Sequence, residues 1–151
     1  MGKRRGFVQM AILQLLNIQE MHGYQIMKEL EERSNGLYSA SAGTIYPALQ
    51  ELMDKGFIDS TIEKDKKVYT LNKAGEMKVR SWHEAETDDF WEHWREHVEW
   101  RQSDESKLLK IQMDQFEHQL RKAIKTVRRQ PKRAPELIDV LQEATKRLQN
   151  F

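Results

Sequence analysis

One carboxylate and two histidines come closest to a metal site in this sequence. Asp89, His93 and His97 are each four residues apart, so a helix would place their side chains in one row. Two imidazoles and a carboxylate are ligands that Zn²⁺ accepts. The chain has no cysteine, however, and no fourth ligand is evident, which favours a histidine pair that is solvated or responds to pH. We therefore predict no metal and no cofactor.

Residue patterns that serve catalysis are also missing from the sequence. It contains no Gly-x-Ser-x-Gly elbow, no phosphate-binding glycine loop and no His-Glu-x-x-His pair. No paired carboxylates stand where a cleft is expected. The sequence predicts a protein that acts by binding and is not an enzyme.

Residues 41–46 have the composition of a helix end that approaches DNA. Ser41, Gly43, Thr44 and Tyr46 supply small side chains, two hydroxyls and a phenol, without a bulky charge. A helix-turn-helix presents the start of its second helix to the major groove, where free N–H groups favour a phosphate. These four residues are therefore predicted to face DNA.

Two tyrosines admit a second interpretation. Tyr24 and Tyr46 could fill the core instead of facing DNA. A half-buried tyrosine whose hydroxyl reaches a phosphate satisfies both interpretations, and we predict that arrangement for both.

Cations suited to backbone phosphates stand in two places near this segment. Lys64, Lys66 and Lys67 occupy a predicted hairpin tip, while Lys3 and Arg4, with the neighbouring Arg5, form a short N-terminal arm. The alternative is that they are ordinary solvated charges. A third basic run, residues 121–133, holds seven cations in thirteen positions. It could contact flanking DNA, but for this run we prefer a solvated helix end.

The elements that must position these residues follow from the spacing of apolar side chains. Three helices are expected: one from about residue 6 to 16, one from the break at residues 21–23 to the turn at residues 34–36, and one from Ser41, as N-cap, to Gly56. Residues 57–63 and 68–71 then read as a two-stranded hairpin, and Asn72 caps another helix. This order predicts a mainly α fold with a small β-hairpin, a winged helix-turn-helix.

An unusual segment of aromatic rings set among acids follows. Trp91 lies three residues before Trp94, and Phe90 four before it, so rings share a helical face. We predict a binding site for a small effector at Phe90, Trp91 and Trp94. The alternative is that these rings fill the core and a dimer interface, as aromatic stripes at helical spacing usually do.

Beyond this segment the chain reads as two helices with narrow apolar seams. The first seam runs through Leu109, Met113, Phe116, Leu120, Ala123 and Val127, and the second through Leu137, Leu141, Ala144, Leu148 and Phe151. Neither helix can bury enough apolar surface alone. We predict a DNA-binding domain over residues 1–75 and a helical dimerisation and effector region over residues 76–151.

Bulk properties set wider limits. The chain has 151 residues, a net charge of +1 and a mean hydropathy of −0.82, and no apolar run reaches the length of a membrane span. The absence of cysteine and of a signal-peptide pattern makes a cytoplasmic protein without a membrane partner the simplest expectation. A winged helix used only for contacts with other proteins remains an alternative to DNA binding.

The chain resembles the PadR family of transcription regulators. The resemblance rests on these stretches and residues: Ile12-Leu13-Gln14-Leu15-Leu16, His22-Gly23-Tyr24, Gly43-Thr44-Ile45-Tyr46-Pro47-Ala48-Leu49, Leu52, Lys55-Gly56-Phe57-Ile58, Lys67-Val68-Tyr69-Thr70-Leu71 and Gly75. It implies a homodimer that binds a palindromic operator in double-stranded DNA, usually as a repressor that a small molecule releases. It also implies that Tyr24, Ser41, Gly43, Thr44, Tyr46 and the hairpin lysines face DNA. One departure is Asn72, where the family commonly has Thr, and Asn caps a helix equally well.

Overall fold

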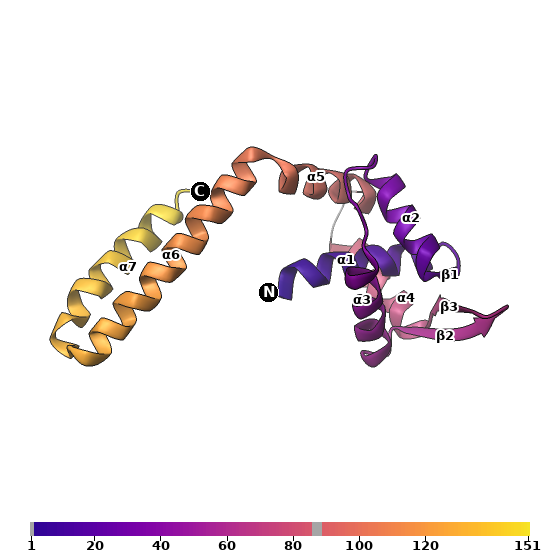
Figure 1. The fold of residues 1–151 in the computed structure, drawn as a ribbon, viewed down its shortest axis with the longest axis horizontal. Coiled ribbons are helices and arrows are strands. Elements are labelled where there is room, and N and C mark those ends of the chain that lie inside the picture. Colours follow the sequence, from indigo (N-terminus) through magenta and orange to yellow (C-terminus); the bar gives the residue numbers. More distant parts are fainter. Residues whose placement is uncertain (1, 86–88) are drawn as a thin grey trace. The chain divides into compact units, whose positions relative to one another are not determined.

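The protein folds into two compact units, residues 1–101 and 102–151 (Figure 1). This computed structural model describes residues 2–85 and 89–151, and the side chains of residues 2–5 and 85 lie outside that description. Within the described residues, no helix is long and apolar enough to cross a membrane. Because each unit has its own contacts, each is described separately.

Helix α1 (Gly2–Leu16) forms the centre of the first unit's core. Ala11, Ile12 and Leu15 are fully buried, as expected from their helical spacing. The helix begins four residues before the predicted start, because the polar residues ahead of Gly6 carry no periodic signal.

Helix α2 (Gly23–Arg33) begins and ends with local hydrogen bonds and backbone turns. At its start the His22 ring Nδ1 accepts from the Gln25 N–H at 3.3 Å, and the Gln25 side chain accepts from the His22 N–H at 3.0 Å. At its end Asn35 and Gly36 both have positive φ, which stops the helix. His22 therefore has a structural role as the N-cap of α2.

Helix α3 (Ala42–Asp54) follows the loop after α2 and ends before Gly56, whose φ is +74°. Ser41 is the N-cap, but the predicted cap hydrogen bond is wrong, because no side chain bonds a first-turn N–H. The Ser41 hydroxyl instead lies 3.0 Å from the Thr44 hydroxyl. The first turn of α3 is thus left without a side-chain cap.

A three-stranded antiparallel sheet replaces the predicted two-stranded hairpin. Strands β2 (Ile58–Glu63) and β3 (Lys66–Leu71) form the hairpin, and β1 (Met21–His22) pairs with the other edge of β3, in the order β1-β3-β2. A two-residue strand has too few positions to show alternation, so the sequence could not indicate it.

The hairpin turns at Lys64 and Asp65, which both have positive φ. Two-residue turns of this kind favour Asn-Gly, because a side chain in the left-handed region costs roughly 1–2 kcal/mol. We expect Asp65→Gly to raise the free energy of unfolding by about 1 kcal/mol, measured by chemical denaturation. In contrast, Asp59→Gly, at an exposed position inside β2, should lower it. Equal losses in both variants would contradict this description of the turn.

Helix α4 (Lys73–Ala85) packs on α1, and its first turn meets the base of the hairpin. Its cap is the predicted one: the Asn72 Oδ1 accepts from the Gly75 N–H at 3.0 Å. A Cβ on Gly75 would meet the Phe57 carbonyl oxygen, a backbone atom that cannot swing away. This contact explains the need for glycine at a helical position.

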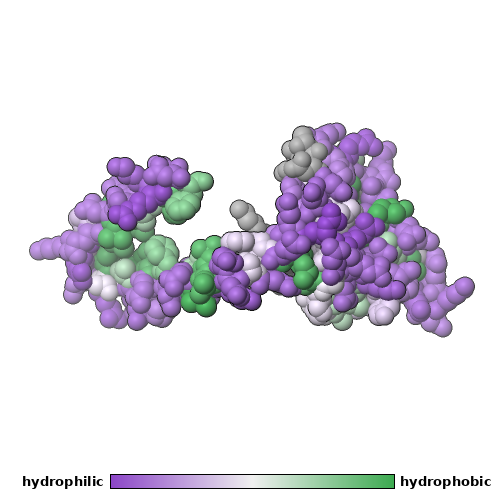
Figure 2. Space-filling model, turned by 90° about the horizontal axis from the view of Figure 1, so that it is seen from above, coloured by the Kyte–Doolittle hydropathy of each residue, from purple (hydrophilic) through white to green (hydrophobic). Residues whose placement is uncertain are grey.

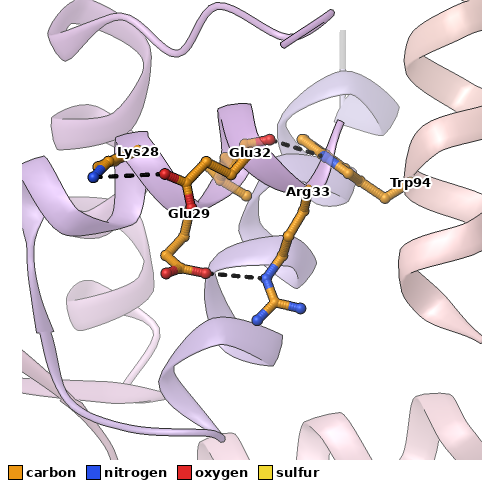
Figure 3. Close-up of polar contacts among 6 residues, drawn as sticks. Lys28, Glu29, Glu32, Arg33 and Trp94 are labelled. Atoms are coloured by element: carbon orange, nitrogen blue, oxygen red, sulfur yellow. Dashed lines mark hydrogen bonds and ion pairs between the residues drawn. The ribbon is translucent and has the colours of Figure 1, made fainter. Parts of the chain in front are cut away.

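Helix α5 (Phe90–Gln102) belongs to the same core. Phe90 and Trp94 are each 1% exposed, and the Trp94 Nε1–H donates to the Leu30 carbonyl at 3.4 Å (Figure 3). On the adjoining surface Arg33 pairs with Glu29 at 3.3 Å and lies 4.2 Å over the Trp91 ring. The first compact unit therefore extends to residue 101. The predicted boundary after residue 75 separates a DNA-binding part from a dimerisation part, and this division stays a prediction.

The second unit is a helical hairpin of α6 (Asp104–Arg129), the short 3₁₀ helix η1 (Pro131–Arg133) and α7 (Ala134–Leu148). Ser103 caps α6 by accepting from the Ser106 N–H at 3.1 Å. Both helices carry their seam residues on one side, and Figure 1 shows them running antiparallel. The predicted class, mainly α with a small β-hairpin, is confirmed.

Candidate nucleic-acid interface

The start of α3 presents the predicted small and hydroxyl residues to solvent. Ser41, Gly43 and Thr44 are exposed, and Tyr46 is 46% exposed. Ile45 between them is fully buried, which fixes the helix against the core. The uncapped first turn and the exposed hydroxyls together form a surface able to accept a phosphate.

Gly43 is not required by the fold. A Cβ built at this position meets no protein atom within 4 Å, and its φ is not positive. Since alanine is the better helix former, the chain alone gives no reason for glycine here. The open space above it is outside the protein, which suits the close approach of another molecule.

The Tyr46 ring packs against the start of α2. A Cβ on Gly23 would lie 2.7–2.9 Å from three atoms of the Tyr46 ring and hydroxyl, so the ring packs over the start of α2. No hydrogen bond of its hydroxyl to another described residue is found. The half-buried ring with an available hydroxyl is the arrangement expected from the sequence.

Tyr69 of β3 interacts electrostatically with Tyr46 and lies under the Lys67 ammonium. Burial, and secondly the neighbouring Tyr46, raises the pKa of Tyr69. The Lys67 ammonium lies 5.6 Å from the centre of the Tyr69 ring. Lys67 therefore lies over a hairpin tyrosine whose pKa also responds to Tyr46.

The remaining residues predicted to face DNA lie outside α3, on the hairpin, α2 and α1. Lys66 follows the opposite face of β3 from Lys67, because successive strand residues alternate, and Lys64 lies at the turn. Tyr24 is 65% exposed on α2, with its ring 6.5 Å from that of His22. The side chains of Lys3 and Arg4 lie outside the described residues.

A buried polar network that sequence reasoning missed holds α3 against α1. The Gln9 Nε2 donates to Glu51 at 2.7 Å, and the Lys55 Nζ donates to the Gln9 Oε1 at 2.8 Å. Gln9 is 6% exposed, so its bonded amide gives α3 a specific orientation. The one signal available in the sequence was a glutamine within an apolar helix face.

A cleft of about 360 Å³ lies directly behind the start of α3. It is lined by Gly43, Thr44 and Pro47 of that helix, by Tyr38 and Ser39 before it, and by Arg101 of α5. Burial raises the pKa of Tyr38, although Arg101 opposes this, so the phenol is neutral at physiological pH. The Tyr38 ring lies 5.0 Å from that of Trp94, edge to face.

The predicted effector residues lie mainly in the core. Phe90 and Trp94 are buried, and neither lines this cleft; Trp91 is half-buried under Arg33. A ligand could reach Phe90 or Trp94 only by displacing core side chains. The effector site at these three residues stays a prediction.

The residues of the predicted acid and histidine row have separate structural contacts. Asp89 accepts from the Trp91 N–H at 2.9 Å, and the His93 ring contacts Trp82. The ring centres of His97 and Phe7 lie 4.4 Å apart. Burial, and secondly the nearby Arg101, lowers the pKa of His97. No cluster of three ligands for a metal is found among the described residues.

Three helices followed by an antiparallel hairpin define a winged helix-turn-helix, with α3 in the place of the recognition helix. Residues 12–81, just under half of the chain, match the transcriptional regulator PadR-like family. The winged-helix part of the chain is therefore similar to a family of transcriptional regulators.

Known proteins similar to this chain carry regulator names. The negative transcriptional regulator PadR of Bacillus subtilis is 39% identical over 77 residues, which cover 48% of this chain and 42% of that protein. A transcriptional regulator from Clostridium thermocellum has a similar structure, with a TM-score of 0.51, 25% identity, and coverage of 66% of this chain and 93% of that one. Bacillus subtilis PadR in complex with operator DNA is similar over 49% of this chain and 45% of that one, with 37% identity and a TM-score of 0.42. The matched segment thus spans less than half of the curated Bacillus relative.

Proposed function

We propose that this protein is a homodimeric repressor that binds a palindromic operator in double-stranded DNA. The exposed start of α3 is the single observation that carries the proposal, because Gly43 has open space where the fold would accept alanine. Ser41, Thr44 and Tyr46 would contact the groove and its phosphates, with Tyr24 beside them. The negative regulator from Bacillus subtilis supports repression as the direction of control.

The hairpin would bind phosphates beside the groove. Lys67 lies over the ring of Tyr69, while Lys64 and Lys66 extend the charge to the tip and the other face. Lys3 and Arg4 would form an N-terminal arm along the same backbone. Such contacts position a protein on DNA without reading its sequence.

We expect Lys66→Ala to weaken binding to all DNA sequences alike. Loss of one phosphate contact should lower the slope of log affinity against log salt by about one. Binding titrations at several salt concentrations would measure this slope, and Lys78→Ala on α4, an exposed cation outside the proposed interface, is the control. An unchanged slope in Lys66→Ala would remove this lysine from the interface.

Dimerisation would use the C-terminal hairpin. Leu109, Met113 and Phe116 continue the α6 seam, yet each is 53–54% exposed. Figure 2 shows apolar surface gathered on this hairpin, at the left of the view, between hydrophilic flanks. A second copy that covers this seam would remove it from water.

Release from DNA would follow the binding of a small aromatic or other stress-related ligand. The cleft behind α3 has the volume of a small-molecule site, and it shares Gly43 and Thr44 with the proposed interface. A ligand there would touch Tyr38, which contacts Trp94, so binding to this site should change tryptophan fluorescence. This connects the aromatic cluster of Phe90, Trp91 and Trp94 with the effector without requiring a ligand inside the core.

A winged helix used for protein contacts is the competing class of function. Selection of bound fragments from genomic DNA separates the two, since a protein-contact module would enrich no sequence. Enrichment of one sequence by the wild-type chain, lost in Tyr46→Ala, is the result expected for a repressor.

A further inference from the structure

The C-terminal half of α6 carries cations on the face opposite its apolar seam. Lys122, Lys125 and Arg129 are spaced i, i+3 and i+7, so they form one row along the helix, and all three are exposed. Lys132 of η1 continues the positive charge beyond the helix end. Leu120, Ala123 and Val127 lie on the other side, half-buried toward α7. We call Lys122, Lys125 and Arg129 the basic stripe.

Nothing within the described chain neutralises the basic stripe. Its three side chains have no ion pair or hydrogen bond with another described residue, and no acid occurs between residues 118 and 133. Several other cations of the same unit do form ion pairs: Lys107 with Asp104, Arg133 with Glu136, and Arg147 with Glu143, at 2.8–3.0 Å. The contrast matters because like charges three or four residues apart destabilise a helix.

Favourable interaction with the helix dipole explains only part of this pattern. The dipole acts within the last turn, where Arg128 and Arg129 lie. Lys122 and Lys125 precede that turn, so the dipole does not account for them. Their row is about 10 Å long from Lys122 to Arg129, at 1.5 Å per residue.

Polyanions are the partners that such a row fits. Duplex DNA offers regularly spaced phosphates along each strand, and cations gain affinity by releasing its counterions. An anionic membrane would require apolar side chains beside the cations, to insert between lipids. From His118 to Arg129, the face that holds the stripe contains no large apolar residue.

We propose that the basic stripe is a second DNA-binding surface, which contacts phosphates of duplex DNA independently of sequence. It is separate from α3 and the hairpin, and it would hold the protein on DNA outside the operator. The proposal concerns the second compact unit alone and does not depend on where that unit lies relative to the first.

A charge-matched pair of full-length variants tests this. Lys122→Gln/Lys125→Gln/Arg129→Gln removes the stripe, and Lys107→Gln/Arg133→Gln/Arg147→Gln removes three paired cations of the same unit. Both are titrated against a long duplex of mixed sequence that contains no selected operator, between 50 and 200 mM salt. We expect the stripe variant to bind about tenfold more weakly at the lowest salt, with a salt slope smaller by up to about three per chain. The control should remain close to wild type.

Two further measurements complete the test. Thermal unfolding and sedimentation of both variants establish that fold and assembly are unchanged, so that weaker binding reflects lost contacts. Vesicles with phosphatidylserine are the second probe, and stripe-dependent binding to them without a change on duplex DNA would overturn the proposal in favour of a lipid surface. Equal salt slopes for the stripe variant, the control and the wild type would also overturn it. Tyr46→Ala, which removes the proposed operator contact, should leave the stripe-dependent difference intact.

Discussion

Gly43→Ala is expected to make the protein more stable and a poorer DNA binder. The new methyl group meets no protein atom, and alanine is favoured over glycine in a helix by roughly 0.5–1 kcal/mol. At a close-fitting interface the same group overpacks the contact, which costs about 1–3 kcal/mol, or roughly ten- to hundredfold in affinity. Chemical denaturation measures the first effect, and titration of a selected operator fragment measures the second.

Gly6→Ala on α1 is the matched control. Its Cβ is equally free of contacts, and the position is exposed in a helix. It should gain stability as Gly43→Ala does and keep operator binding. If Gly43→Ala bound the operator with wild-type affinity, the start of α3 would not be the surface that approaches DNA.

Phe116→Lys should separate the proposed dimer and weaken operator binding further. Phe116 is 53% exposed in the single chain, so the substitution costs the isolated hairpin little. Across a dimer seam it places an unpaired charge in an apolar contact, which costs several kcal/mol. A monomer holds one α3 in place of two and loses the gain from simultaneous binding, about hundredfold or more. Sedimentation and operator titration measure the two effects.

Ile111→Lys provides the comparison on the same helix. Ile111 is 51% exposed, and it precedes Met113 by two residues, which places it on the opposite side of α6 from the seam. This variant should remain dimeric. A wild-type chain that sediments as a stable monomer at micromolar concentration would exclude the dimer altogether.

Most of the winged helix could be predicted from local patterns. Helices α1 to α3 follow from apolar residues at helical spacing, Ser41 and Gly56 mark the two ends of α3, and Asn72 marks the start of α4. The two-residue strand β1 could not be predicted, because it forms only through pairing with Val68 and Tyr69 far along the chain. The missing cap bond of Ser41 depends on a hydroxyl rotation that spacing does not determine.

The sequence predicted the residue types of the candidate site more successfully than the contacts that hold those residues in place. The exposure of Ser41, Gly43 and Thr44 agrees with the expected helix end. The packing of Tyr46 against Gly23 is a tertiary contact, which no local pattern contains. The Gln9, Glu51 and Lys55 network joins residues more than forty positions apart, so no local pattern contains it. Likewise, the aromatic spacing of Phe90 and Trp94 was consistent both with a ligand site and with the core that they fill.

Selection of genomic DNA fragments by the full-length protein, followed by footprinting of the enriched sequence, tests the central claim most directly. The proposal predicts one two-fold symmetric sequence, with half-sites about 34 Å apart, one duplex turn, or a multiple of it. Enrichment should disappear with Gly43→Ala and persist with Gly6→Ala. Enrichment of no sequence, or of one that both variants bind alike, would contradict an operator-binding role for α3.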